Sequence, residues 1–94
     1  MNQKNSHLRD NETLALQVVQ FLAGDADRLG RFLALSGIAP ADLKNTLNEP
    51  AFLGGVLDYL LGDETLLQEF CANAGVSPEQ PARARRALPG AGGE

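Results

Sequence analysis

The sequence predicts an all-α protein, a compact bundle of five or six short helices built from two similar units of about 38 residues each. Residues 18–40 recur without a gap as residues 56–78. The stretches between the turns carry apolar residues at helical spacing, and no stretch alternates in the manner of a β-strand. A shared period of this length indicates a shared supersecondary unit.

Two short turn motifs mark the repeat. Gly24-Asp25 recurs as Gly62-Asp63, and the Gly-Ile-Ala-Pro sequence of residues 37–40 recurs as Gly-Val-Ser-Pro at residues 75–78. A Gly just past a helix can adopt the left-handed conformation, and an Asp after it can cap the next helix. Pro suits the first helical position, where no N–H is needed. Each unit is therefore predicted as three helices joined by two tight turns.

Composition favours one helical domain at residues 10–88, with repeat units at about 14–47 and 52–88. Apolar residues make up 44% of the chain but aromatic residues only 5%, so the core must be built mainly from aliphatic side chains. Residues 1–9 are expected to be a disordered lead and residues 89–94 a disordered tail. Solenoids usually need about three or more units, so two units are expected to close into a globule.

The first helix of each unit is expected to lie near the middle of the fold, because each carries a wide apolar arc. The first arc includes Val18 and Leu22, and the second includes Val56 and Leu60. Gly54-Gly55 interrupts the second arc, at a cost of about 1 kcal/mol per Gly relative to Ala. We expect a neighbouring helix to cross there within backbone distance; the alternative is a late helix start that leaves both glycines in a frayed end.

The helix expected at residues 25–36 is amphipathic, with Leu29 and Phe32 on its inward face and Arg28 and Arg31 pointing outward. The third segment of the first unit, residues 40–47, is expected to be a short helix. It should end before the Asn-Glu-Pro sequence of residues 48–50, because the residue before Pro resists helical geometry.

The last helix is predicted over residues 78–88 and has a well-marked start. Ser77 and Gln80 have the spacing of a capping box. Its second half carries three basic residues, Arg83, Arg85 and Arg86. Basic residues late in a helix are favoured by its dipole, or they can pair with acidic groups elsewhere in the chain.

Charge and hydropathy narrow the function classes. The net charge is −4, and between residues 40 and 80 Lys44 is the only base against seven acids. This balance disfavours nucleic acid or anionic membranes as partners. No apolar run approaches the roughly 20 residues of a membrane span, and no leader peptide is recognisable. We expect a cytoplasmic protein that does not associate with membranes.

No residue pattern predicts catalysis, a metal or a cofactor. Cys71 occupies the position of Leu33 in the repeat and is expected to be a small core residue, because the lone His7 lies in the lead and offers it no base. Asp25 and Asp27 could suggest a divalent ion, but two carboxylates in a first helical turn are explained by the helix dipole alone. The chain is therefore not expected to be an enzyme.

Residues 71–77, followed by the helix with the three arginines, resemble a helix-turn-helix, a family of DNA-binding motifs. The resemblance covers about 18 residues and rests on a small residue before the turn Gly75 and a hydrophobic residue just after it. It implies that Arg83, Arg85 and Arg86 contact DNA. In that family the position of Pro81 is normally an aliphatic anchor, so Pro81 is expected to weaken the seating of the last helix as a recognition helix.

From Leu14 to Leu88 the chain also resembles a small, uncharacterised all-helical alphaproteobacterial family of unknown function, with the same duplicated leucine-rich helices and Gly-Asp turns. The resemblance implies a fold and no activity. Our interpretation is a small cytoplasmic protein-interaction or assembly module that binds an unidentified protein partner without catalysis. The alternative is a helix-turn-helix-like DNA-binding protein that uses residues 78–88. The sequence determines neither the partner nor the oligomeric state.

Overall fold

The computed structural model describes the backbone of residues 3–88 and the side chains of residues 10–88. The described chain contains helices and no strand, so the all-α class is confirmed. The elements are α1 (Gln3–Ala23), α2 (Ala26–Ser36), a 3₁₀ turn η1 (Pro40–Asp42), α3 (Leu43–Thr46), α4 (Pro50–Leu61), α5 (Glu64–Ala74) and α6 (Glu79–Ala87).

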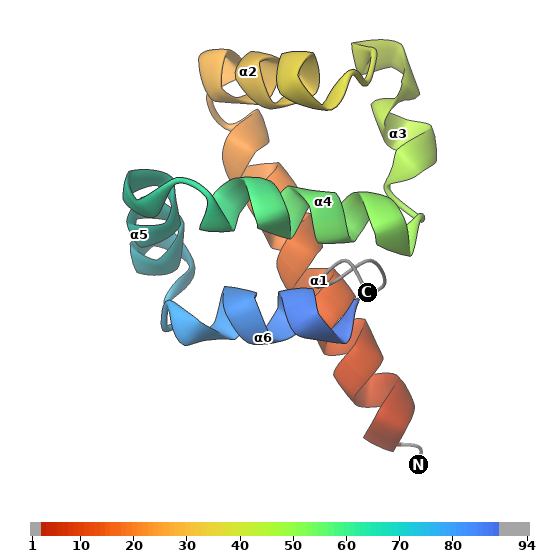
Figure 1. Cartoon of the computed structure of the whole chain (residues 1–94), viewed down its shortest axis with the longest axis vertical. Coiled ribbons are helices and arrows are strands. Elements are labelled where there is room, and N and C mark those ends of the chain that lie inside the picture. The colour runs from red at the N-terminus through yellow and green to blue at the C-terminus, as the bar shows by residue number, and fades with distance from the viewer. Residues whose placement is uncertain (1–2, 89–94) are drawn as a thin grey trace.

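The helices are arranged around the long helix α1. In Figure 1, α1 runs diagonally behind α2, α4 and α6, which lie roughly parallel to one another across it, with α5 at one end and α3 at the other. Helix α1 contacts α2, α4, α5 and α6, and α4 also contacts α5 and α6. The principal-axis extents of 39 × 28 × 26 Å describe a compact globule.

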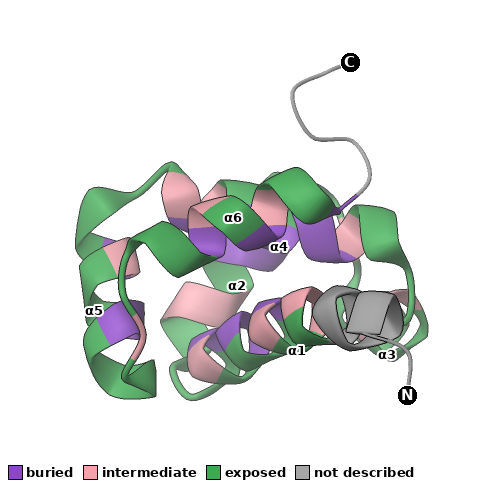
Figure 2. Cartoon of the chain, turned by 90° about the horizontal axis from the view of Figure 1, so that it is seen from below, coloured by how far each residue is buried: buried purple, intermediate pink, exposed green. Residues whose placement is uncertain are grey.

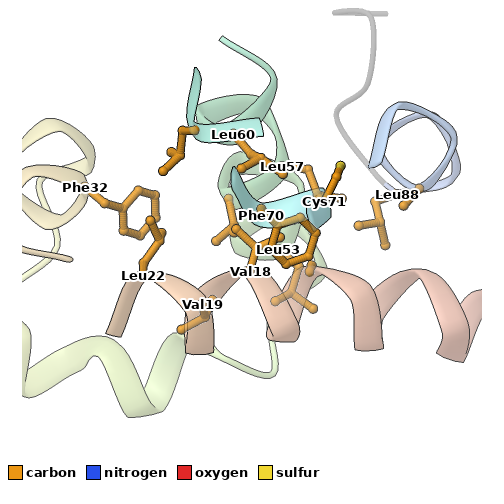
Figure 3. Close-up of a cluster of buried hydrophobic side chains, with 14 of the residues drawn as sticks. Val18, Val19, Leu22, Phe32, Leu53, Leu57, Leu60, Phe70, Cys71 and Leu88 are labelled. Atoms are coloured by element: carbon orange, nitrogen blue, oxygen red, sulfur yellow. The ribbon is translucent and has the colours of Figure 1, made fainter. Parts of the chain in front are cut away.

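The core lies where α1 and α4 cross, as their wide apolar arcs predict. Val18 and Leu22 of α1, Leu53 and Leu57 of α4 and Phe70 of α5 belong to one cluster. In Figure 3, Val18 lies beside Leu53 and Phe70, and Leu22 lies towards α2. All five side chains are buried. Because the core draws on both halves of the chain, we expect that neither half buries its apolar arc alone.

The turn chemistry is confirmed at four positions. The Asp25 carboxylate accepts hydrogen bonds from the N–H groups of residues 27 and 28, and that of Asp63 accepts one from residue 66. Gly37 and Gly75 end α2 and α5 in the left-handed conformation, with φ of 75° and 73°.

The left-handed geometry expected at Gly24 and Gly62 is wrong, because Gly37 and Gly75 are the only described residues with positive φ. The chain leaves α1 and α4 instead through tight bonds of the 3₁₀ type. The N–H of Asp25 donates to the carbonyl of Leu22 at 3.0 Å, and that of Asp63 donates to the carbonyl of Leu60 at 3.2 Å. A left-handed residue is not needed at either turn.

Two boundaries differ from the sequence expectation. Helix α1 begins at Gln3, whereas order was expected from Asp10 or Asn11. Residues 3–9 contain neither Pro nor Gly, and extending a helix that tertiary packing has already nucleated costs little. Helix α6 begins at Glu79, and half of its capping box is formed, since the Gln80 side chain accepts from the Ser77 N–H at 3.0 Å. The tail predicted at residues 89–94 lies outside the described residues.

The third segments of the two predicted units are placed differently. Helix α6 packs against both α1 and α4, whereas η1 and α3 make only slight contact with the other helices. The two-unit repeat therefore stays a prediction.

Candidate interaction surface

The three predicted arginines lie on α6 in different surroundings. Arg85 donates from Nε to Asp58 Oδ1 of α4 at 2.7 Å and from Nη1 to the carbonyl of Leu88 at 3.4 Å, and its side chain is only 12% exposed. Arg83 pairs with Glu79 one turn earlier on the same helix at 3.2 Å. Arg86 is exposed. The structure thus brings one of the three against the acid-rich middle of the chain and leaves the other two at the surface.

Pro81 is itself a buried anchor, which corrects the expectation that it weakens the seating of the last helix. It is among the largest fully buried side chains of the described residues. With Ala84 and Leu88 it forms the buried side of α6, and exposed residues cover the other side (Figure 2). The Pro ring supplies apolar volume in the first turn, where its missing N–H costs nothing.

The other predicted chemical candidates have structural roles or lie outside the described side chains. Cys71 is a free thiol, 6% exposed, and burial raises its pKa, which suppresses the thiolate. Asp25 caps α2. Among the described residues, no group of three or more His, Cys, Asp or Glu side chains could hold a metal ion. The His7 side chain lies outside the described ones.

Arg28 joins three helices, although the sequence places it on an outward face. It forms an ion pair with Glu69 of α5, and its guanidinium lies over the Phe21 ring of α1, 5.2 Å from the centroid. Asp25 lies 3.8 Å from its Nε atom. Arg28 therefore fixes one end of α2 against α1 and α5.

The sequence patterns did not predict an apolar groove of about 300 Å³ between α2 and α4. Its lining consists of Phe32, Leu35, Ser36, Gly55, Asp58 and Tyr59. The Phe32 ring meets Tyr59 edge-on, with 5.1 Å between centroids, and Phe52 likewise at 5.9 Å. Leu35 is 71% exposed, far more than Leu16 of α1 at 36%. One signal existed, because Leu35 lies outside the apolar face predicted for residues 25–36.

The expected close helix crossing does not occur at Gly55, and at Gly54 it stays a prediction. Gly54 is buried, but Gly55 is exposed, and a Cβ added at Gly55 would meet nothing within 4 Å. The late-start alternative is also wrong, because α4 begins at Pro50. A mid-helix Gly costs about 1 kcal/mol relative to Ala, and among the described residues no packing contact requires it at position 55.

A polar pocket of about 230 Å³ adjoins the groove, and the two share Tyr59. Its charged lining consists of Asp27, Arg28, Arg31, Asp63 and Glu69. Glu69 already pairs with Arg28. The apolar residues of the groove form a floor. The charged residues of the groove and the pocket form its rim, with four acids and two bases. We call this surface the α2–α4 groove.

These features define a small all-helical domain with an open apolar groove and no described catalytic constellation. The chain belongs to the family described as "Protein of unknown function (DUF3572)", whose model matches residues 9–91. The comparison with curated proteins finds no match, and the comparison with solved structures finds none. Within the described part of the chain, no helix combines the length and the apolar character that crossing a membrane requires.

Proposed function

We propose that the protein is a small cytoplasmic protein-interaction module that binds a segment of a partner protein in the α2–α4 groove and has no catalytic activity. The observation that carries the proposal is the 71% exposure of Leu35 beside the ring of Phe32. Isolated exposed leucines are ordinary, but this one borders a concave apolar surface. The free, buried Cys71 is compatible with a reducing compartment.

The groove can supply useful binding energy despite its small size. Burying a Leu side chain contributes about 1.5–3 kcal/mol, and a groove of this volume can also accept an apolar side chain from the partner. A few well-packed contacts of this kind usually dominate the affinity of an interface. Leu35 and the edge of Tyr59 are the expected energetic centre.

The polar groups of the groove favour binding over catalysis. The Ser36 hydroxyl donates to the carbonyl of Leu33 at 3.2 Å, and Asp58 accepts from Arg85. A nucleophile would need an adjacent base, and a general acid or base would need an aligned partner. Neither arrangement occurs among the described residues that line the groove.

DNA binding through α6 is the weaker proposal. Asp58 engages Arg85 and Glu79 engages Arg83, so only Arg86 of the three makes no pair with a described acid. Binding to phosphates needs several basic side chains on one face. The net charge of −4 also opposes approach to a duplex.

A photo-cross-linking amino acid placed at Leu35 tests the proposal in the native cell, with the same amino acid at Leu16 as the matched control. We expect a specific adduct from position 35 alone. The adduct is identified by mass spectrometry, and the recombinant partner should bind the wild-type chain but not Leu35→Asp. Equal adducts from both positions, or a partner indifferent to Leu35→Asp, would show that the groove is not the binding surface.

A further inference from the structure

The walls of the α2–α4 groove restrict the shape of its occupant. Both walls are helices, so their backbone N–H and C=O groups are already paired along most of their length. An extended peptide would find no sheet edge to complete its backbone hydrogen bonds. A helix satisfies its own backbone groups and needs only apolar and charged contacts from its host.

Aromatic side chains join the two helical walls, α2 and α4. The two lie roughly parallel in Figure 1, and the rings of Phe32, Phe52 and Tyr59 bridge them. On the side away from the groove, α4 already carries α6. On the groove side, Gly55 has open space above its Cα atom, so a neighbouring helix can approach the α4 backbone closely there.

The charged side chains around the groove indicate which charge a partner segment should carry. Around the groove and its adjoining pocket stand four acids, Asp27, Asp58, Asp63 and Glu69, and two bases, Arg28 and Arg31. Arg28 pairs with Glu69, and Arg85 pairs with Asp58, so these four groups largely cancel. Asp27 and Asp63 against Arg31 leave the rim with a small acidic excess. The whole chain carries a charge of −4, which opposes both an acidic partner and a second copy of itself.

We propose that the occupant is an amphipathic helix of a partner protein, with a large apolar residue seated over Gly55 against Phe32 and Tyr59 and with Lys or Arg residues flanking that apolar face. This inference rests on the proposed function and adds the chemical class of the partner. The apolar residue covers Leu35, and the basic flanks face Asp27 and Asp63. The affinity then depends on ionic strength, because the charged contacts lie at the solvent-exposed rim.

A displayed library of random peptides, about 16 residues long so that a helix can form, tests the inference on the full chain. Peptides selected on the wild-type protein are then tested on Gly55→Leu, which fills the open space of the groove. The control is Gly30→Leu, since Gly30 is also an exposed mid-helix Gly whose added Cβ would meet nothing within 4 Å, but it lies outside the groove. Thermal unfolding checks that both variants are folded.

We expect enriched peptides with apolar residues at i, i+3 or i+4 and a net positive charge. Their affinity should fall at least tenfold on Gly55→Leu, remain within twofold on Gly30→Leu, and weaken several-fold between 50 and 500 mM salt, as screened rim charges require. Because the two variants carry the same net charge, this difference excludes non-specific attraction of basic peptides to an acidic protein.

The contrary outcomes separate the two proposals. Peptides that need the groove but are neutral, acidic or without helical spacing would overturn the assigned partner chemistry and leave the proposed function standing. Failure of every peptide to distinguish wild type from Gly55→Leu, together with no adduct at position 35, would overturn both. Sedimentation that shows a dimer dissociated by Gly55→Leu would identify a second copy as the occupant and overturn the inference.

Discussion

The ring of Phe32 in α2 meets the ring of Tyr59 in α4 edge-on, with 5.1 Å between centroids and 64° between the ring planes. A second edge contact joins Phe32 to Phe52 at 5.9 Å. Such pairs contribute about 0.5–1.5 kcal/mol each beyond area burial. One side chain of α2 therefore supports that helix against α4, and contacts within the chain shape the groove.

Phe70→Ala should remove most of the stability of the domain. Phe70 is 1% exposed, at the centre of the core, and meets the Phe21 ring edge-on at 5.6 Å. Large-to-small changes of this kind cost about 3–5 kcal/mol, because the lost burial is compounded by a cavity. For a small domain that is most of its free energy of unfolding. Urea denaturation measures the loss; a change below about 1 kcal/mol would mean that the core is not packed as described.

Cys71 should be unreactive in the native protein. A thiol reagent should label it slowly at neutral pH and quickly after denaturation, because the buried thiol has a raised pKa. A fast reaction of the native chain would revive the thiol as a nucleophile.

The same raised pKa of Cys71 predicts a pH dependence of stability. The folded chain holds the thiol proton more tightly than the unfolded chain. The stability linked to this proton is therefore fully present below the unfolded pKa of about 8.5 and is lost as the pH rises towards the folded value. Cys71→Ala provides the control, since it should lack this component of the alkaline decline.

The arginines of α6 should contribute unequally to stability. Changing Arg83, Arg85 and Arg86 together to Ala should lower the free energy of unfolding by about 1 kcal/mol, nearly all of it from Arg85, whose partner Asp58 is 59% exposed. The single changes at the other two positions should have effects within about 0.5 kcal/mol. A double-mutant cycle with Asp58→Asn isolates the Arg85 pair. Equal contributions from all three would contradict the described pairing.

Duplex DNA should not be retained by the protein, even at low salt. If the arginines did contact phosphates, log affinity would fall with log salt at about −0.9 per phosphate neutralised. Gel retardation across a salt series measures this slope. Salt-sensitive binding that the triple Ala change abolishes, in a chain that remains folded, would favour the helix-turn-helix function instead.

The local signals of the sequence predicted most of the fold. Asp25, Asp63, Gly37 and Gly75 act at their predicted helix ends, because caps and left-handed turns depend on neighbouring residues alone. The apolar arcs of α1 and α4 were also predictable, because the spacing of apolar residues determines which side of a helix must be buried. Both arcs meet in the core.

Contacts between distant residues could not be predicted in this way. Arg28 appeared to be an outward residue on its helix, yet it pairs with Glu69, which is 41 positions away. Gly55 suggested a close crossing, but periodicity does not say which side of α4 receives α6 and which stays open. The exposure of Leu35 depends on that same arrangement. The position of Leu35 outside the predicted apolar face was the one sequence signal for the groove, and it did not show which residues of α4 would lie beside it.

If the α2–α4 groove stays open for a partner rather than for the fold, Gly55→Ala should raise stability and weaken binding. Its methyl group would meet nothing within 4 Å, so the change should raise the free energy of unfolding by about 0.5–1 kcal/mol through helix propensity. Gly30→Ala in α2 should give a similar gain, since its methyl group is equally free of contacts.

The decisive measurement is binding of the partner cross-linked from position 35 to both variants, by calorimetry beside their unfolding curves. We expect Gly55→Ala to be stabilised but to bind more weakly, and Gly30→Ala to be stabilised and to bind as the wild type does. Destabilisation by Gly55→Ala, or binding that is unchanged by it, would show that the open space at Gly55 does not serve a partner.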